Sequence, residues 1–101
     1  MTEYTLQQKL IAEFIGTLLL TYTICLTAVW GSSGDFHPGF AIAAILMAMI
    51  YSLGYISGAH FNPAVTIGVW IRGFCEKADV LPYIATQSIA GVFGALLSGF
   101  T

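Results

Sequence analysis

Three long apolar stretches dominate the sequence, and each has the length of a helix that crosses a lipid bilayer. They cover residues 10–30, 40–56 and 81–100. A helix needs about 17 to 25 apolar residues to span a hydrocarbon core of about 30 Å. Pro82 falls where the first turn of the third helix is expected, a position that proline tolerates well. The pattern therefore predicts three transmembrane helices.

A fourth apolar stretch, residues 62–71, is too short to cross. Ten helical residues rise only about 15 Å. The stretch nevertheless has a strong helix start, because Asn62 can cap the helix and Pro63 suits its first position. Polar and charged residues follow from Arg72 onward, so the far end returns to water. This predicts a re-entrant loop and half-helix over residues 57–71.

The descending arm of this excursion is predicted to be non-helical over residues 54–61. Small residues are frequent there, and they allow a tight backbone path. Non-helical backbone at membrane depth must be buried in protein or line a wet cavity. Periodicity alone leaves an alternative open, in which an ordinary helix from residue 40 is followed by an interfacial helix.

Composition supports the membrane assignment. The chain of 101 residues is 57% hydrophobic and 8% charged, whereas soluble domains carry about 25% charged residues. Its net charge of −2 comes with no basic cluster, which argues against nucleic-acid binding. The first stretch is too long for a signal peptide, follows a barely basic leader and contains Glu13, so we expect it to be retained as a helix.

The basic residues predict the orientation. Lys9 precedes the first helix, while Arg72 and Lys77 follow the half-helix. Three crossings and one re-entrant excursion place all three on one side, and the loop 31–39 has no basic residue. Because basic loops stay in the cytoplasm, we expect a cytoplasmic N-terminus in a multi-pass protein.

Neither cysteine suggests a cofactor or a reaction. Cys25 lies inside the first apolar stretch and Cys75 in a polar connector, with no CxxC spacing and no histidine near Cys75. We interpret both as unpaired thiols. No metal site, cofactor or catalytic motif is expected, so the chain is not interpreted as an enzyme.

Three segments together resemble one family. Residues 57–66, SGAHFNPAVT, are similar to the first NPA loop of the major intrinsic proteins, the aquaporins and glycerol facilitators. Residues 12–17, AEFIGT, resemble the first-helix signature of that family, and Gln87 with Gly91 resembles its third helix. The similarity covers nearly the whole chain, residues 10–100.

The resemblance implies an all-α membrane protein consisting of one N-terminal repeat over residues 1–101. Family members have two inverted repeats whose NPA loops meet at mid-membrane, and here the second repeat is absent. The arginine that follows the second NPA is also absent, since Val65 follows this one. The chain is therefore expected to be either a fragment or a half-length product.

The resemblance also assigns site residues. Asn62 is expected to cap the half-helix and to donate its amide N–H groups to a permeating molecule, although capping alone would explain it. The expected pore lining comprises Gly58, Ala59, His60, Phe61, Asn62, Pro63 and Ala64 of the loop, and Ile42 and Leu46 of the second helix. The carbonyls of residues 58–61 would form a ladder of acceptors. Ile42 takes the constriction position by resemblance but matches neither water nor glycerol channels, so ordinary packing remains open for it.

A carboxyl inside an apolar helix is expensive and therefore functional or structural. By resemblance, Glu13 braces the loop by accepting hydrogen bonds from its backbone, joined by His60 and Gln87. The alternative to this bracing role is a proton relay through these residues.

The expected function is passive transport of water, with glycerol or another small neutral solute as a further substrate. The resemblance implies a second aquaporin-like repeat as partner, assembly into a tetramer, and residence in a lipid bilayer, for which we expect the plasma membrane. The alternative is a non-conducting truncated relative that assembles with or regulates full-length channels.

Overall fold

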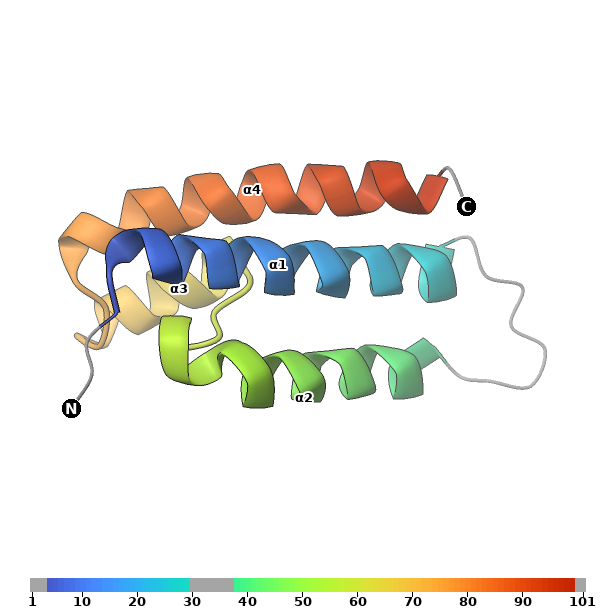
Figure 1. The fold of residues 1–101 in the computed structure, drawn as a ribbon, viewed down its shortest axis with the longest axis horizontal. Coiled ribbons are helices and arrows are strands. Elements are labelled where there is room, and N and C mark those ends of the chain that lie inside the picture. Colours follow the sequence, from blue (N-terminus) through green and yellow to red (C-terminus); the bar gives the residue numbers. More distant parts are fainter. Residues whose placement is uncertain (1–3, 30–37, 100–101) are drawn as a thin grey trace.

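The computed structural model describes residues 4–29 and 38–99, and this part of the chain is helical with no strand. Figure 1 shows the long helices α1, α2 and α4 lying side by side, with the short helix α3 at one end of the bundle. The elements are α1 (Leu6–Ile24), the π-helical turn η1 (Cys25–Val29) that continues it, α2 (Pro38–Ser57), α3 (Pro63–Ile71) and α4 (Lys77–Gly99). The predicted all-α fold is confirmed.

Helix α1 begins four residues before the apolar stretch because a capping box starts it. The Thr5 hydroxyl accepts a hydrogen bond from the Gln8 backbone N–H at 3.2 Å. In return, the Gln8 side chain accepts one from the Thr5 N–H at 2.9 Å. These reciprocal bonds satisfy amide groups that a helix start otherwise leaves unpaired. Hydrophobicity marks only the membrane-embedded part of a helix, so the polar first turn was missed.

The non-helical arm after α2 is shorter than predicted, although the apolar stretch 40–56 matches the end of the helix to within one residue. We expected residues 54–61 to be non-helical, but the Gly58 N–H still bonds to the Gly54 carbonyl at 2.8 Å and the helix ends only at Ser57. The non-helical arm is therefore residues 58–61. The helix stops where Gly58 adopts a φ of +89°, a left-handed conformation that glycine accepts without strain.

Helix α4 also begins four residues earlier than predicted, at Lys77. Pro82 is consequently inside the helix instead of in its first turn. A proline there has no N–H to donate to the carbonyl four residues before it. Asp79 lies in the first turn, where a negative charge interacts favourably with the helix dipole.

Helix α1 is the centre of the bundle. Helices α2 and α4 both pack on α1, and α3 packs on α4. In the described part of the chain, α2 meets α4 through the hydrogen bond from the Tyr83 hydroxyl to the Ser57 carbonyl. The backbone of α1 approaches α4 so closely at Gly94 that an added Cβ would lie 2.6 Å from the Leu18 carbonyl oxygen. Ala90 and Gly94 are both buried in this contact, which is how small residues let helices pack tightly.

Three of the helices are long and apolar enough to cross a membrane, namely Leu6–Thr27, Gly39–Ser57 and Lys77–Gly99. Figure 1 shows the start of α1, the end of α3 and the start of α4 at the same end of the bundle. Lys9, Arg72 and Lys77 belong to these segments, so the predicted clustering of basic residues is present. The predicted helix ends at Trp30 and Phe100 lie outside the described residues.

Candidate functional site

The short helix α3 begins as its sequence predicts. The Asn62 side-chain oxygen accepts a hydrogen bond from the Ala64 N–H at 2.7 Å, and Pro63 occupies the first helical position. The helix spans nine residues, Pro63–Ile71, and is closed by Arg72 and by Gly73 at a φ of +85°. Because the cap uses Oδ1, the Asn62 amide nitrogen keeps both of its donors, and the residue is exposed.

The five residues between α2 and α3 have an unusual backbone. Gly58, Ala59 and Phe61 all have positive φ values, of 89°, 57° and 54°. For a residue with a Cβ this conformation costs about 1–2 kcal/mol. The arm therefore keeps its shape only if surrounding contacts compensate for that strain.

Glu13 supplies those contacts. Its carboxylate is fully buried and accepts four hydrogen bonds. The donors are the His60 N–H at 3.1 Å, the Phe61 N–H at 2.8 Å, the Ser57 hydroxyl at 2.6 Å and the Gln87 side-chain amide at 2.6 Å. The predicted contact between Glu13 and the loop backbone is present. Hydrogen bonds to a charged acceptor are about twice as strong as neutral ones, so they can hold a strained arm.

A second line of buried polar groups joins α4 to the loop. Besides Glu13, the Gln87 amide nitrogen donates to the Thr66 hydroxyl oxygen at 2.9 Å. The same oxygen lies 3.0 Å from Nδ1 of His60. Gln87 and Thr66 are buried, and His60 is half-buried. His60 and Gln87 therefore lie in hydrogen-bond contact with the Glu13 cluster, and the bracing role expected of them stays a prediction.

The loop lies about halfway along α1. Phe61 is buried with its ring against Gly16, where an added Cβ would overlap it. Gly16 is ten residues after the start of α1, which corresponds to about 15 Å along the helix axis. The N-terminus of α3 is thus placed well inside the bundle and away from its ends.

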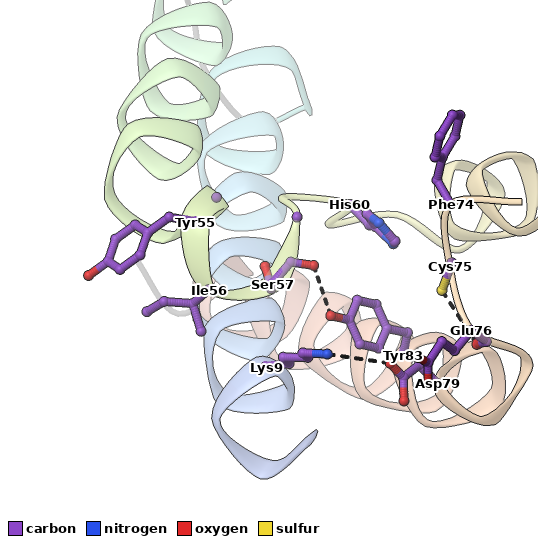
Figure 2. Close-up of a pocket in the computed structure, with 12 residues that line it drawn as sticks. Lys9, Tyr55, Ile56, Ser57, His60, Phe74, Cys75, Glu76, Asp79 and Tyr83 are labelled. Atoms are coloured by element: carbon purple, nitrogen blue, oxygen red, sulfur yellow. Dashed lines mark hydrogen bonds and ion pairs between the residues drawn. The ribbon is translucent and has the colours of Figure 1, made fainter. Parts of the chain in front are cut away.

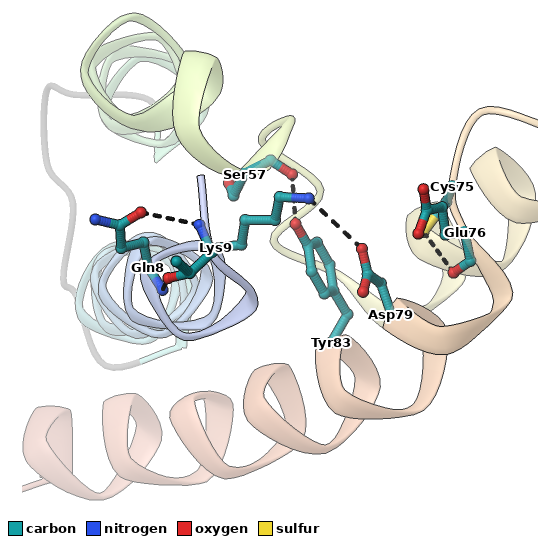
Figure 3. A network of polar contacts seen from close by, with 8 residues as sticks. Gln8, Lys9, Ser57, Cys75, Glu76, Asp79 and Tyr83 are labelled. Atoms are coloured by element: carbon teal, nitrogen blue, oxygen red, sulfur yellow. Dashed lines mark hydrogen bonds and ion pairs between the residues drawn. The ribbon is translucent and has the colours of Figure 1, made fainter. Parts of the chain in front are cut away.

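A polar pocket of about 400 Å³ opens from the loop toward the end of the bundle where α1 starts (Figure 2). His60, Ser57 and Tyr83 line it, and the Tyr83 hydroxyl donates to the Ser57 carbonyl at 2.8 Å. Figure 3 shows the Lys9 side chain reaching toward Asp79, 3.7 Å away, beside this bond. These contacts tie the start of α1 and the end of α2 to α4.

Comparison with known proteins gives the family. The family described as Major intrinsic protein matches residues 1–101, the full length of the chain. The chain belongs to the major intrinsic protein family. The resemblance based on the NPA loop is confirmed, and the chain is an integral membrane protein.

Curated relatives match over most of this chain. Aquaporin Z of Photorhabdus laumondii is 39% identical over 94 residues, covering 87% of this chain and 41% of that protein. Aquaporin NIP1-1 of Arabidopsis thaliana is 44% identical over 93 residues, covering 87% and 31%. The probable aquaporin AqpM of Archaeoglobus fulgidus is 36% identical, covering 92% and 47%. The chain therefore spans less than half the length of these relatives.

The structure does not bring the α2 candidates to the NPA loop of this major intrinsic protein. Ile42 is half-buried, and it precedes the end of α2 at Ser57 by about 22 Å of helix. Leu46 is 36% exposed on the same helix. Pro63 is half-buried and Ala64 exposed at the start of α3. A pore-lining role for Ile42 and Leu46 remains a prediction.

Sequence reasoning missed three members of the cluster. Ser57 was treated only as a small residue, Thr66 only as part of the motif, and Tyr83 was not singled out. Tyr83 and Gln87 are four residues apart on α4 and therefore share a face, which was an available signal. Thr66 is likewise a polar residue inside an apolar half-helix.

Both cysteines of the chain are free. Cys75 is half-buried in the connector between α3 and α4 and lines the polar pocket. Burial raises the pKa of the Cys75 thiol, and the negative charge of Asp79 raises it further. The thiol is therefore a weak nucleophile at neutral pH.

Proposed function

We propose that the chain forms one half of a membrane channel for the passive transport of water, with glycerol or a similar small neutral solute as a further substrate. The observation that carries this proposal is the position of the α3 N-terminus. Asn62 caps it with Oδ1 and keeps two amide donors, about halfway along α1. The relatives named above are aquaporins, which supports a channel of this kind.

The electrostatics of this position suit a neutral solute. A helix N-terminus carries roughly half a positive charge. At the middle of a membrane that charge repels cations, while the Asn62 donors orient the oxygen of a water molecule toward them. The neighbouring arm 58–61 lies outside any helix, so its carbonyls are available as acceptors for the hydrogens of the same solute.

The pore needs a second wall. Helix α2 packs on α1 and leaves α3 uncovered on its own side. Gly58 and Asn62 are exposed there, although polar backbone cannot face lipid inside a membrane. We propose that a second aquaporin-like repeat of opposite topology covers this side. It would be supplied by the rest of a longer polypeptide or by a partner chain, with tetramers as the assembly, the N-terminus in the cytoplasm and the plasma membrane as the location.

Reconstitution tests the channel function. The coding sequence from Met1 to its stop codon is expressed, and the purified product is reconstituted into proteoliposomes. We expect osmotic shrinkage, followed by stopped-flow light scattering, to be much faster than in protein-free liposomes and to have a low activation energy. A parallel glycerol gradient shows whether that solute also passes. A folded product with two repeats and no excess water flux would refute the proposal and favour the non-conducting relative.

A further inference from the structure

The buried hydrogen bonds from Glu13 through Gln87 and Thr66 to His60 have a direction that their chemistry determines. The chain of contacts starts at an acceptor, because both Glu13 side-chain oxygens face backbone N–H groups of the loop, which can only donate. Glu13 is also saturated, since all four of its neighbours are donors. Each later group in the chain of contacts must act as a donor or an acceptor according to what the group before it requires.

The first step sets the orientation of the Gln87 amide. Its nitrogen lies 2.6 Å from Glu13 Oε1 and 2.9 Å from the Thr66 hydroxyl oxygen. Turning the amide over would place its carbonyl oxygen against the carboxylate oxygen, and two acceptors repel one another. The nitrogen therefore faces both groups, although the Gln87 Oε1 atom has no partner among the described residues.

The second step sets the role of Thr66. Its hydroxyl oxygen accepts from Gln87, and its single proton still needs an acceptor, because the residue is completely buried. His60 Nδ1 at 3.0 Å is the remaining hydrogen-bond partner of this hydroxyl in the described part of the chain. Thr66 satisfies its proton only if Nδ1 carries a lone pair.

We propose that Thr66 is a positioning residue that holds neutral His60 in the Nε2–H tautomer, so that His60 offers the pocket a hydrogen-bond donor and no acceptor. His60 lines the 400 Å³ pocket, and its Nε2 has no hydrogen-bond partner among the described residues. The neighbouring Tyr83 ring, 5.1 Å away between centroids, does not compete, because its hydroxyl is committed to Ser57. Figure 2 shows His60 directed from the loop toward the Cys75 side of the pocket.

The donor defines the class of molecule that His60 can bind. Water or an alcohol presents an oxygen lone pair to Nε2–H, whereas ammonium has donors alone and finds no acceptor on the ring. A ring with Nδ1 occupied and Nε2 already protonated also takes up no proton from a chain of waters. This deepens the proposed channel function and rests on it only in naming water or a neutral solute as the occupant.

Nitrogen NMR tests the tautomer without requiring conduction. The chain is labelled with ¹⁵N-histidine, reconstituted into lipid nanodiscs and studied at about pH 8, well above the ordinary histidine pKa of about 6.5. The chain has two histidines, His37 and His60, and the variant His37→Gln assigns their signals. Long-range correlations to the ring protons identify Nε2, and its chemical shift shows whether it is protonated. We expect a protonated Nε2 and an unprotonated Nδ1.

Two variants test the part played by Thr66. Thr66→Ser keeps the hydroxyl and should retain the wild-type ring signals. Thr66→Val has nearly the same shape without the hydroxyl, and should give a mixture of ring tautomers. A wild-type ring protonated at Nδ1 would overturn the proposal, as would an unchanged tautomer in a folded Thr66→Val variant. If Thr66→Val does not fold, the wild-type and Thr66→Ser spectra still decide the question.

Discussion

Glu13 is a buried carboxylate that is surrounded by hydrogen-bond donors instead of by a positively charged side chain. Two of these are backbone groups of the loop, and two are side chains from α2 and α4. In an apolar medium an unpaired ionised group is very unfavourable, and so is an unpaired buried donor. One residue thus accepts hydrogen bonds from backbone groups of the loop that are 47 and 48 residues away in sequence.

We expect Glu13→Leu to lower the free energy of unfolding by at least about 3 kcal/mol, because it leaves several buried donors unpaired. Thermal unfolding in detergent, followed by circular dichroism, measures the change. Glu76→Leu makes the same replacement at an exposed position and should change stability by less than about 0.5 kcal/mol. Equal effects of the two substitutions would contradict the role assigned to Glu13.

Gly16 is important because there is no room for a side chain at this position, and not because of its backbone conformation. An added Cβ would overlap the buried Phe61 ring, so Gly16→Ala should destabilise the protein by about 1–3 kcal/mol. Gly91→Ala is the matched control, since its Cβ would meet only the Thr21 hydroxyl at an ordinary 3.8 Å. The same unfolding assay compares them. A Gly16→Ala protein as stable as Gly91→Ala would show that the ring is not confined as described.

At the scale of elements, Asn62 at the start of α3 has two roles, one in capping the helix and one in the proposed pore. Asn62 closes the first turn with its oxygen and leaves its nitrogen free. The side-chain oxygen stabilises the start of the helix, and the nitrogen supplies donors to the proposed pore. Substitutions can therefore separate the two roles.

Asn62→Ala removes the cap and should cost about 1 kcal/mol of stability. Asn62→Asp keeps a capping oxygen and a favourable charge at the helix start, so stability should stay within about 0.5 kcal/mol of wild type. Its amide donors are lost, however, and we expect water flux in the complete channel to fall. Unfolding and stopped-flow measurements on both variants check this. Full flux through a folded Asn62→Asp channel would mean that Asn62 serves only as a cap.

The existence and type of the elements could be predicted well, but three of their boundaries could not. Apolar length identified the three crossing helices and the half-helix, because the membrane imposes that length directly. The starts of α1 and α4 and the start of the non-helical arm after α2 were each misplaced by about one turn. Those boundaries depend on the Thr5–Gln8 capping box, on the polar first turn of α4 and on the backbone of Gly58, to which hydrophobicity does not respond.

At the scale of the whole molecule, the bundle leaves the α2 side and the neighbouring loop exposed. The segment Gly39–Ser57 has no buried residue in its most apolar window, and the loop and α3 present exposed polar groups next to it. A channel needs walls all round. The basic residues Lys9, Arg72 and Lys77 oppose an upside-down second copy, which would place all three on the wrong side.

We therefore expect that the 101-residue chain does not conduct water alone as a monomer. Proteoliposomes that contain only this chain should shrink no faster than empty ones in the stopped-flow assay. Their protein content and helicity are measured in parallel, so that loss of protein is not mistaken for lack of flux. Rapid flux with a low activation energy would refute this prediction and point to an antiparallel dimer.

Cys75 reports the orientation of the chain. It lies in the connector between α3 and α4, on the proposed cytoplasmic side, so an impermeant maleimide should label inside-out vesicles and not right-side-out ones. Because the pKa of the Cys75 thiol is raised, labelling should be slow at neutral pH. While the pH stays below that pKa, the labelling rate should increase about tenfold for each unit by which the pH is raised. Cys75→Ser retains Cys25 inside the first span as a control. Labelling of right-side-out vesicles alone would reverse the proposed topology.

The sequence by itself determined the membrane class, the three crossings, the half-helix with its Asn62 cap and the family. These features follow from local apolar length, from capping chemistry and from a motif of consecutive residues. Only the tertiary structure showed that Ser57, Thr66 and Tyr83 complete the cluster and that Lys9 meets Asp79. It alone also showed which atoms donate to Glu13, up to 74 residues away in sequence. Such contacts depend on how helices rotate and approach one another, which no local pattern encodes.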